Sequence, residues 1–164
     1  VPFWIETSGI RAVHACWHPP SLNTLRDYLS EDNTIRNTET LAQLTHRNGS
    51  GFYAAEATLK GLEYPLPEGY TFLDKDGRRR SQARIRWWRG GETLPLKNAI
   101  FSDADLIDQL PEMQISLPLD SHYAMDQIPV LFGHYWLPHD SKPMPQTQNV
   151  ACLDYSAGKG GQTT

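Results

Sequence analysis

The sequence has no apolar run that approaches the length of a membrane span and no strong excess of charge of either sign. It holds 15 Lys and Arg against 19 Asp and Glu, a formal net charge of -4 over 164 residues. Because a bilayer span takes about 20 consecutive apolar residues, we expect no association with a membrane. A mildly acidic chain offers no electrostatic footprint for long nucleic acid, so we expect any anionic partner to be small.

Cysteine is scarce as well. Cys16 and Cys152 each lie inside an apolar segment, and neither belongs to a CxxC motif. Such cysteines are typical of buried small hydrophobic residues in a reducing compartment, and no secretory signal is visible, so we expect a cytoplasmic protein. A disulfide between the two cysteines is the alternative.

The rest of the composition, 39% hydrophobic and 21% charged, is that of an ordinary globular domain. No repeat, low-complexity tract or interdomain linker interrupts the chain, so we expect residues 1–164 to form a single domain of the α/β class. Hydrophobic periodicity predicts buried strands within residues 10–17, 128–132 and 150–153, helices at 22–29, 38–47, 52–62 and 101–112, and a strand or extended linker at 113–120.

A β-hairpin is predicted between residues 64 and 88. The stretch D-K-D-G is typical of the turn at its tip, at Asp76-Gly77, and apolar residues then alternate with Arg84 and Arg86. The planar guanidinium groups of these two arginines lie on one face of the predicted strand, where they suit a phosphate. The alternative is a solvated strand face.

Two histidines end apolar strands: His14 in A-V-H-A-C-W and His134 in L-F-G-H-Y-W. Ligands gather beyond the carboxyl ends of strands in α/β sheets, so both are candidate metal ligands; the alternative is a pair of satisfied interior histidines. Gly133 allows a sharp turn and a close approach by a ligand. Asp154 ends the last strand before a glycine-rich stretch, which predicts either a site carboxylate or a simple turn.

Four stretches of the sequence carry a family resemblance. They are V-H-A-C-W-H-P-P-S-L-N-T-L, L-K-G-L-E-Y-P-L-P-E-G-Y-T-F-L-D-K-D-G-R-R-R followed by R-I-R-W-W, V-L-F-G-H-Y-W, and N-V-A-C-L-D-Y-S-A-G-K-G-G. Together, in this order and over nearly the whole chain, they resemble the C-terminal half of the bacterial calcineurin-like metallophosphoesterases. The resemblance is nearest to the branch of the diadenosine tetraphosphatases and the serine/threonine protein phosphatases.

The resemblance implies a four-layer α/β/β/α sandwich with two divalent metal ions, Mn²⁺ or ions of the Fe and Zn type, at the strand ends. Such a pair of ions activates a bridging hydroxide and clamps the phosphoryl oxygens during in-line attack. By motif, His14 and His134 correspond to two ligands of the same metal. Arg84, Arg86 and Asp154 are weaker candidates for holding the phosphate.

The sequence also departs from the family pattern. Trp136 stands where many members have the second histidine of G-H-x-H, and the motifs G-D-x-H-G, G-D-x-x-D-R-G and G-N-H-E are absent. We therefore expect a C-terminal fragment of a phosphoester hydrolase, inactive alone, whose catalytic residues lie upstream of Val1. The expected substrate is a small phosphorylated molecule or a phosphoprotein, and His18 and His139 are expected at the rim of the site.

Two other functions are compatible with the sequence. In the first, the arginines of the hairpin act beside Trp87 and Trp88 as a non-catalytic module that binds a nucleotide or a single strand. In the second, the region has lost catalysis and serves as a scaffold for a partner.

Overall fold

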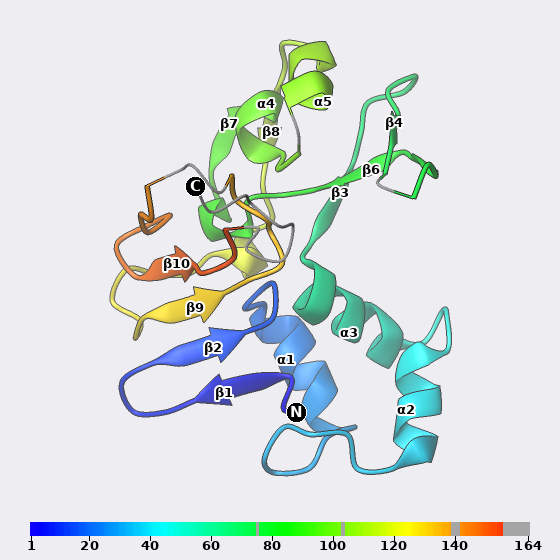
Figure 1. Ribbon diagram of the computed structural model, residues 1–164, viewed down its shortest axis with the longest axis vertical. Coiled ribbons are helices and arrows are strands. Elements are labelled where there is room, and N and C mark those ends of the chain that lie inside the picture. Colours follow the sequence, from blue (N-terminus) through cyan, green and yellow to red (C-terminus); the bar gives the residue numbers. More distant parts are fainter. Residues whose placement is uncertain (75, 103, 139–141, 156–164) are drawn as a thin grey trace, which may run out of the picture. The chain divides into compact units, whose positions relative to one another are not determined.

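The computed structural model describes all residues except 75, 103, 139–141 and 156–164 (Figure 1). The chain folds into two compact units, one formed by residues 1–60 together with 123–164 and the other by residues 61–122. Helices and small sheets occur in both, so the chain is a mixed α/β protein, as expected. The expected single domain stays a prediction.

The first unit is built on a four-stranded sheet in the order β1-β2-β9-β10. Its strands are β1 (Trp4–Glu6), β2 (Arg11–Val13), β9 (Val130–Phe132) and β10 (Val150–Cys152). The last three run parallel, whereas β1 pairs antiparallel with β2. Two neighbours in this sheet, β2 and β9, are therefore separated by more than a hundred residues of chain.

Alternation along these strands gives the sheet one largely buried face, on which Glu6 and Arg11 are the charged residues at one end. Its side chains come from all four strands: Trp4, Val13, Val130, Phe132, Val150 and Cys152. Helix α1 (Pro19–Arg26) lies on this face, since the Arg26 guanidinium sits 5.6 Å over the Trp4 ring. Helix α3 (Ser50–Lys60) packs beside α1, and α2 (Thr38–Thr45) packs on α3.

The helix ends follow local sequence rules with one correction. Asn37 caps α2 by accepting a hydrogen bond from the amide of Thr40, and Gly61, at a φ of 93°, follows the end of α3. The expected start of the first helix at residue 22 is wrong: α1 begins at Pro19. Proline is tolerated in the first turn of a helix because the amides there have no intrahelical partner.

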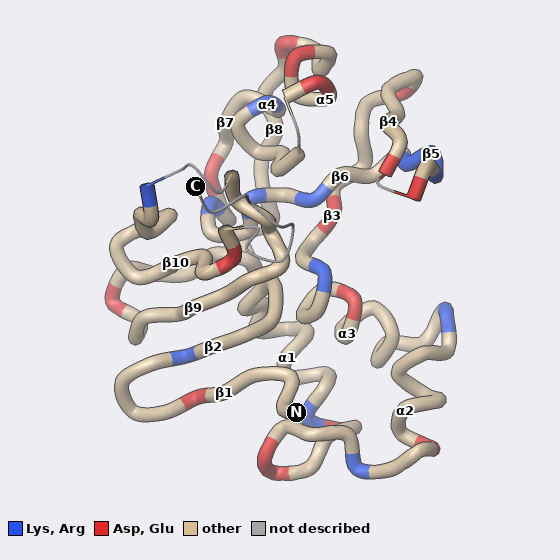
Figure 2. Tube along the Cα trace, viewed as in Figure 1, with Lys and Arg blue, Asp and Glu red and all other residues tan. Residues whose placement is uncertain are grey.

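The second unit contains the predicted hairpin. Its strands are β3 (Glu63–Pro65), paired with β6 (Gln82–Arg84), and β4 (Phe72–Leu73), paired with β5 (Arg79–Arg80). The predicted turn at Asp76-Gly77 is confirmed: the Asp74 carboxylate accepts hydrogen bonds from the amides of Asp76 and Arg78. Figure 2 shows basic residues concentrated on β5 and β6.

The predicted strand does not continue through Trp88. After β6, the chain turns into a short 3-10 helix, η1 (Trp87–Arg89), and both tryptophans are buried, at 0% and 7% exposure. Alternation would have exposed one of them. The turn ends at Gly90, where a Cβ would meet Ser121 and His122 at 2.4–2.5 Å, so only glycine allows this approach.

The remaining elements of the second unit surround a small apolar core. They are β7 (Thr93–Pro95), α4 (Leu96–Ala99), α5 (Ala104–Gln109), β8 (Gln114–Ser116) and η2 (Leu119–Ser121). The core consists of Leu66, Ala83, Ile85, Leu94, Leu96, Ala99, Ile100, Leu106, Leu110, Ile115 and Leu117. The segment at 113–120 thus contains a strand, β8, which pairs with β7.

The cysteines and the apolar helices were the subject of two expectations. Cys16 and Cys152 are both buried and both are free thiols, as expected for small core residues. Burial raises the pKa of the Cys152 thiol. None of the described helices is long and apolar enough to cross a membrane.

The packing of α1 predicts a large effect at Leu25, which is fully buried. We expect Leu25→Ala to lower the free energy of unfolding by about 2–5 kcal/mol, through lost burial and the cavity left behind. Leu41→Ala in α2 is the control, since Leu41 is 45% exposed. Urea unfolding followed by circular dichroism measures both, and equal effects would contradict the packing of α1.

Candidate metal centre

His14 and His134 meet at the carboxyl end of two neighbouring parallel strands. β2 and β9 pair in register, Arg11 with Val130 and Ala12 with Leu131, and the amide of Gly133 donates to the carbonyl of His14 at 2.9 Å. His14 follows directly on β2, and His134 follows β9 after Gly133. Their ring centroids lie 5.0 Å apart with an interplanar angle of 43°.

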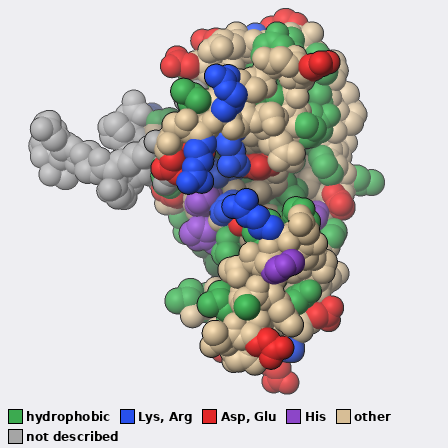
Figure 3. All heavy atoms as spheres, turned by 90° about the vertical axis from the view of Figure 1, so that its right-hand side faces the viewer, with side chains coloured by type: hydrophobic (Ala, Val, Ile, Leu, Met, Phe, Trp, Pro, Cys, Tyr) green, Lys and Arg blue, Asp and Glu red, His purple; other side chains and the backbone are tan. Residues whose placement is uncertain are grey.

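Both imidazoles are accessible, but they differ in backbone conformation. His14 is exposed and His134 is half-buried, and Figure 3 shows histidine side chains at the molecular surface. His134 has a φ of 65°, in the left-handed region, and Trp136, 6.4 Å from it between ring centroids, has a φ of 42°. Non-glycine residues held in this region concentrate at functional sites, where the surrounding structure fixes them.

The sharp turn expected at Gly133 is therefore made by its neighbours. A Cβ on Gly133 would meet the His14 carbonyl oxygen at 3.4 Å and the Asp154 Cβ at 3.7 Å, which are ordinary contacts. Because Gly133 has no side chain, it leaves space beside these two groups. Gly133 lines an open pocket between His14 and Asp154, and a side chain there would occupy part of it.

This pocket has a volume of about 410 Å³ and lies at the carboxyl ends of the three parallel strands. Its lining consists of Ala12, Val13, His14, Leu131, Phe132, Gly133, Leu153 and Asp154. The lining is mostly apolar, with His14 and Asp154 as its polar side chains, a composition typical of ligand sites. Sequence reasoning missed the apolar lining residues, of which Ala12 and Val13 come just before His14 and Leu153 just before Asp154.

The described residues hold no complete metal site. No group of three or more His, Cys, Asp or Glu side chains that could hold a metal ion occurs among the described residues. Two imidazoles 5.0 Å apart between centroids nonetheless suit a shared divalent ion, because neutral imidazole is a common ligand of Zn, Fe and Cu ions. Two imidazoles alone do not complete the coordination shell of such an ion, so further ligands would be needed.

The two predicted phosphate-binding arginines belong to the second unit. Arg84 ends β6 opposite Glu63, and Arg86 lies beyond the strand, donating from Nε to the carbonyl of Ile100 at 3.3 Å. The Arg86 guanidinium sits 5.6 Å over the Phe101 ring. Burial, together with the charge of Arg89, lowers the pKa of Arg86. Half-buried guanidinium groups of this kind are suited to binding anions.

Of the two histidines expected at the rim of the site, the structure describes only His18. His18 precedes α1, and its Nδ1 lies 2.7 Å from the Ser21 hydroxyl oxygen. This contact holds the half-buried His18 ring against the first turn of the helix. His139 lies outside the residues that the structure describes.

Comparison with known proteins does not place the chain in a family: no family model, no curated protein and no solved structure matches it.

The left-handed backbone of His134 makes a specific prediction. We expect His134→Gly to be about 1 kcal/mol more stable than His134→Ala, because a left-handed residue with a Cβ costs energy that glycine avoids. At His14, whose φ is not positive, the order should reverse, with Ala more stable than Gly. Urea unfolding of the four variants tests this, and the same order at both positions would contradict it.

Proposed function

We propose that this chain is part of a metal-dependent phosphoester hydrolase, to which His14 and His134 contribute two ligands of one metal ion. The supporting observation is the convergence of their imidazoles, 5.0 Å apart between centroids, beside a pocket at the carboxyl ends of parallel strands. A pair of divalent ions, Mn²⁺ or of the Fe and Zn type, would supply an activated hydroxide and stabilise the transferring phosphoryl group. The remaining ligands and the catalytic residues belong, in this proposal, to a part of the protein outside these 164 residues.

The sheet of the first unit supports the finer proposal of a four-layer sandwich. On the face opposite α1, the register aligns a row of apolar residues across all four strands: Ile5, Ala12, Leu131 and Ala151. Ile5 is 51% exposed, and Leu153 beyond β10 is 64% exposed. A sheet that is apolar on both faces is typical of the inner layer of a sandwich, so we propose that a second sheet packs on this row.

The proposed substrate is a small phosphorylated molecule or a phosphoprotein. The His14–His134 pair would hold the metal that binds the phosphoryl oxygens, and Asp154 lines the same pocket as His14. Arg84 and Arg86 remain candidates for the substrate phosphate, because a guanidinium stays charged even when burial lowers its pKa. Arg86 lies beyond the end of β6, so this proposal does not require both arginines to project from one face of the same strand.

A nucleotide-binding or single-strand-binding module is less well supported. Binding of this kind uses exposed aromatic rings on which bases stack. Trp87 and Trp88 are buried, at 0% and 7% exposure, so their rings offer no such platform. We therefore retain the hydrolase as the proposed function.

Hydrolysis tests the proposal in the protein that carries this chain together with the motifs G-D-x-H and G-N-H-E. We expect His14→Ala and His134→Ala each to lower Mn²⁺-dependent release of phosphate from an aryl phosphate or a dinucleoside polyphosphate by at least about 100-fold, because each removes a metal ligand. His46→Ala, at the exposed end of α2, is the matched control and should retain activity. Full activity in both site variants would refute the assignment.

A further inference from the structure

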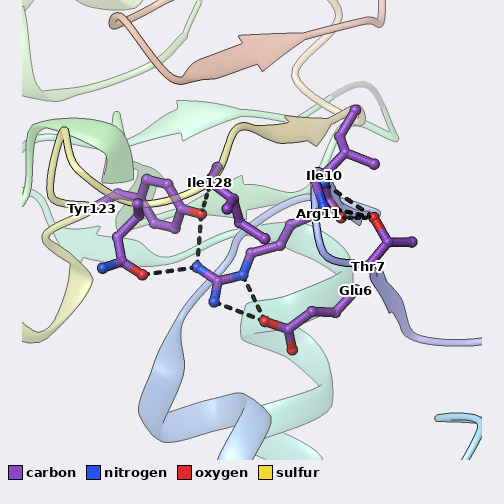
Figure 4. Close-up of polar contacts among 8 residues, drawn as sticks. Glu6, Thr7, Ile10, Arg11, Tyr123 and Ile128 are labelled. Carbon is purple, nitrogen blue, oxygen red and sulfur yellow. Dashed lines mark hydrogen bonds and ion pairs between the residues drawn. The ribbon is translucent and has the colours of Figure 1, made fainter.

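A half-buried guanidinium joins three segments around the start of β2 (Figure 4). Arg11 donates from Nε to the Glu6 carboxylate at 2.8 Å, and its Nη1 donates to the Tyr123 hydroxyl at 2.9 Å and to Gln127 Oε1 at 3.1 Å. Its side chain is 18% exposed, and the guanidinium lies 4.9 Å over the Trp17 ring. Although burial opposes the charge, the bonds to Tyr123 and Glu6 raise the pKa of Arg11.

The segment held by Arg11 is the one that leads into β9. The Tyr123 hydroxyl donates onward to the carbonyl of Ile128 at 2.6 Å, and the amide of Arg11 itself donates to the carbonyl of Pro129 at 2.8 Å. The guanidinium and the backbone of one residue on β2 therefore hold residues 123–129 at several points. These points fix where β9 begins to pair with β2.

Asn149 holds the same segment from the side of β10. Its Nδ2 donates to the carbonyls of Ala124 at 2.8 Å and Gln127 at 3.0 Å, and its backbone carbonyl accepts from Val130 at 2.8 Å. Asn149 is 7% exposed. Asn149 is thus a buried residue that holds the same segment, but from the side of β10.

We infer that Arg11 is a positioning residue that sets the distance between the imidazoles of His14 and His134. The two histidines follow the strands β2 and β9, which pair with Arg11 opposite Val130. A slip of one residue between paired strands reverses the face of every side chain on the moved strand. The effect of this spacing on metal binding rests on the proposed function. The distance between the two imidazoles can itself be measured without a metal.

The test compares Arg11→Met, Arg11→Lys and Asn149→Ala with the unaltered 164-residue chain. Two quantities are measured by NMR: the nuclear Overhauser effect between the ring protons of His14 and His134, and the affinity for Zn²⁺ from the shifts of the same rings. We expect Arg11→Met to lose the ring-to-ring effect and at least about tenfold in Zn²⁺ affinity, as is typical when a group that orients a metal ligand is removed. Arg11→Lys should recover part of both, because an ammonium can bond Glu6 or Tyr123 but lacks the planar fork that reaches both.

Asn149→Ala separates positioning from a general loss of stability. It should lower the melting temperature while retaining the ring-to-ring effect and the Zn²⁺ affinity. An unchanged ring-to-ring effect in both Arg11 variants, or an equal loss in Asn149→Ala, would overturn the inference.

If the unaltered chain shows the ring-to-ring effect but binds no Zn²⁺, the metal function fails while the role of Arg11 in spacing is still decided. If Arg11→Met does not fold, Arg11→Lys alone gives the decision.

Discussion

The candidate site depends on the parallel pairing of β2 with β9. These two strands are distant in the sequence, yet their pairing brings both carboxyl ends to one edge of the sheet, and each strand is followed by a histidine. The amide of Gly133 bonds to the carbonyl of His14, which extends the pairing one step beyond the strands. The imidazoles are thereby held 5.0 Å apart between ring centroids. Any change in this pairing would separate them.

The other features of the first unit follow from that constraint. A parallel sheet is normally covered on both faces, and here α1 covers one face while an apolar row that includes Leu131 lies on the other. The pocket forms where this row meets the polar strand ends. His134 completes the site in a left-handed conformation that opposes stability, which is expected where geometry is held for function. The proposal therefore has two parts: further ligands complete the metal site, and a second sheet covers the other face of this one.

Much of this site could be predicted from the sequence because its signals are local. An apolar run that stops at a histidine marks a strand end, and both runs do end as β2 and β9. The convergence of His14 with His134 follows from the general behaviour of parallel strands. The turn at Asp76-Gly77 was equally predictable, because its conformation is fixed by the few residues that form it.

The errors arise where contacts distant in sequence decide the structure. Alternation predicts a strand through Trp88, but burial of both tryptophans and the close approach at Gly90 replace it with a 3-10 turn. The hydrogen bonds of Arg11 could not be predicted from the sequence either. Its partners Tyr123 and Gln127 lie more than a hundred residues away and belong to no recognisable motif. An arginine inside an otherwise apolar strand was the one local signal of it.

Binding of one metal ion by two imidazoles is the central claim, and a titration with paramagnetic Mn²⁺ tests it most directly. The ring signals of His14, His134 and the exposed His46 would be followed by NMR in the 164-residue chain. We predict that the signals of His14 and His134 broaden together, at the same Mn²⁺ concentration and well before those of His46. Broadening of only one of the two, or of both only at the concentration that affects His46, would contradict a shared site.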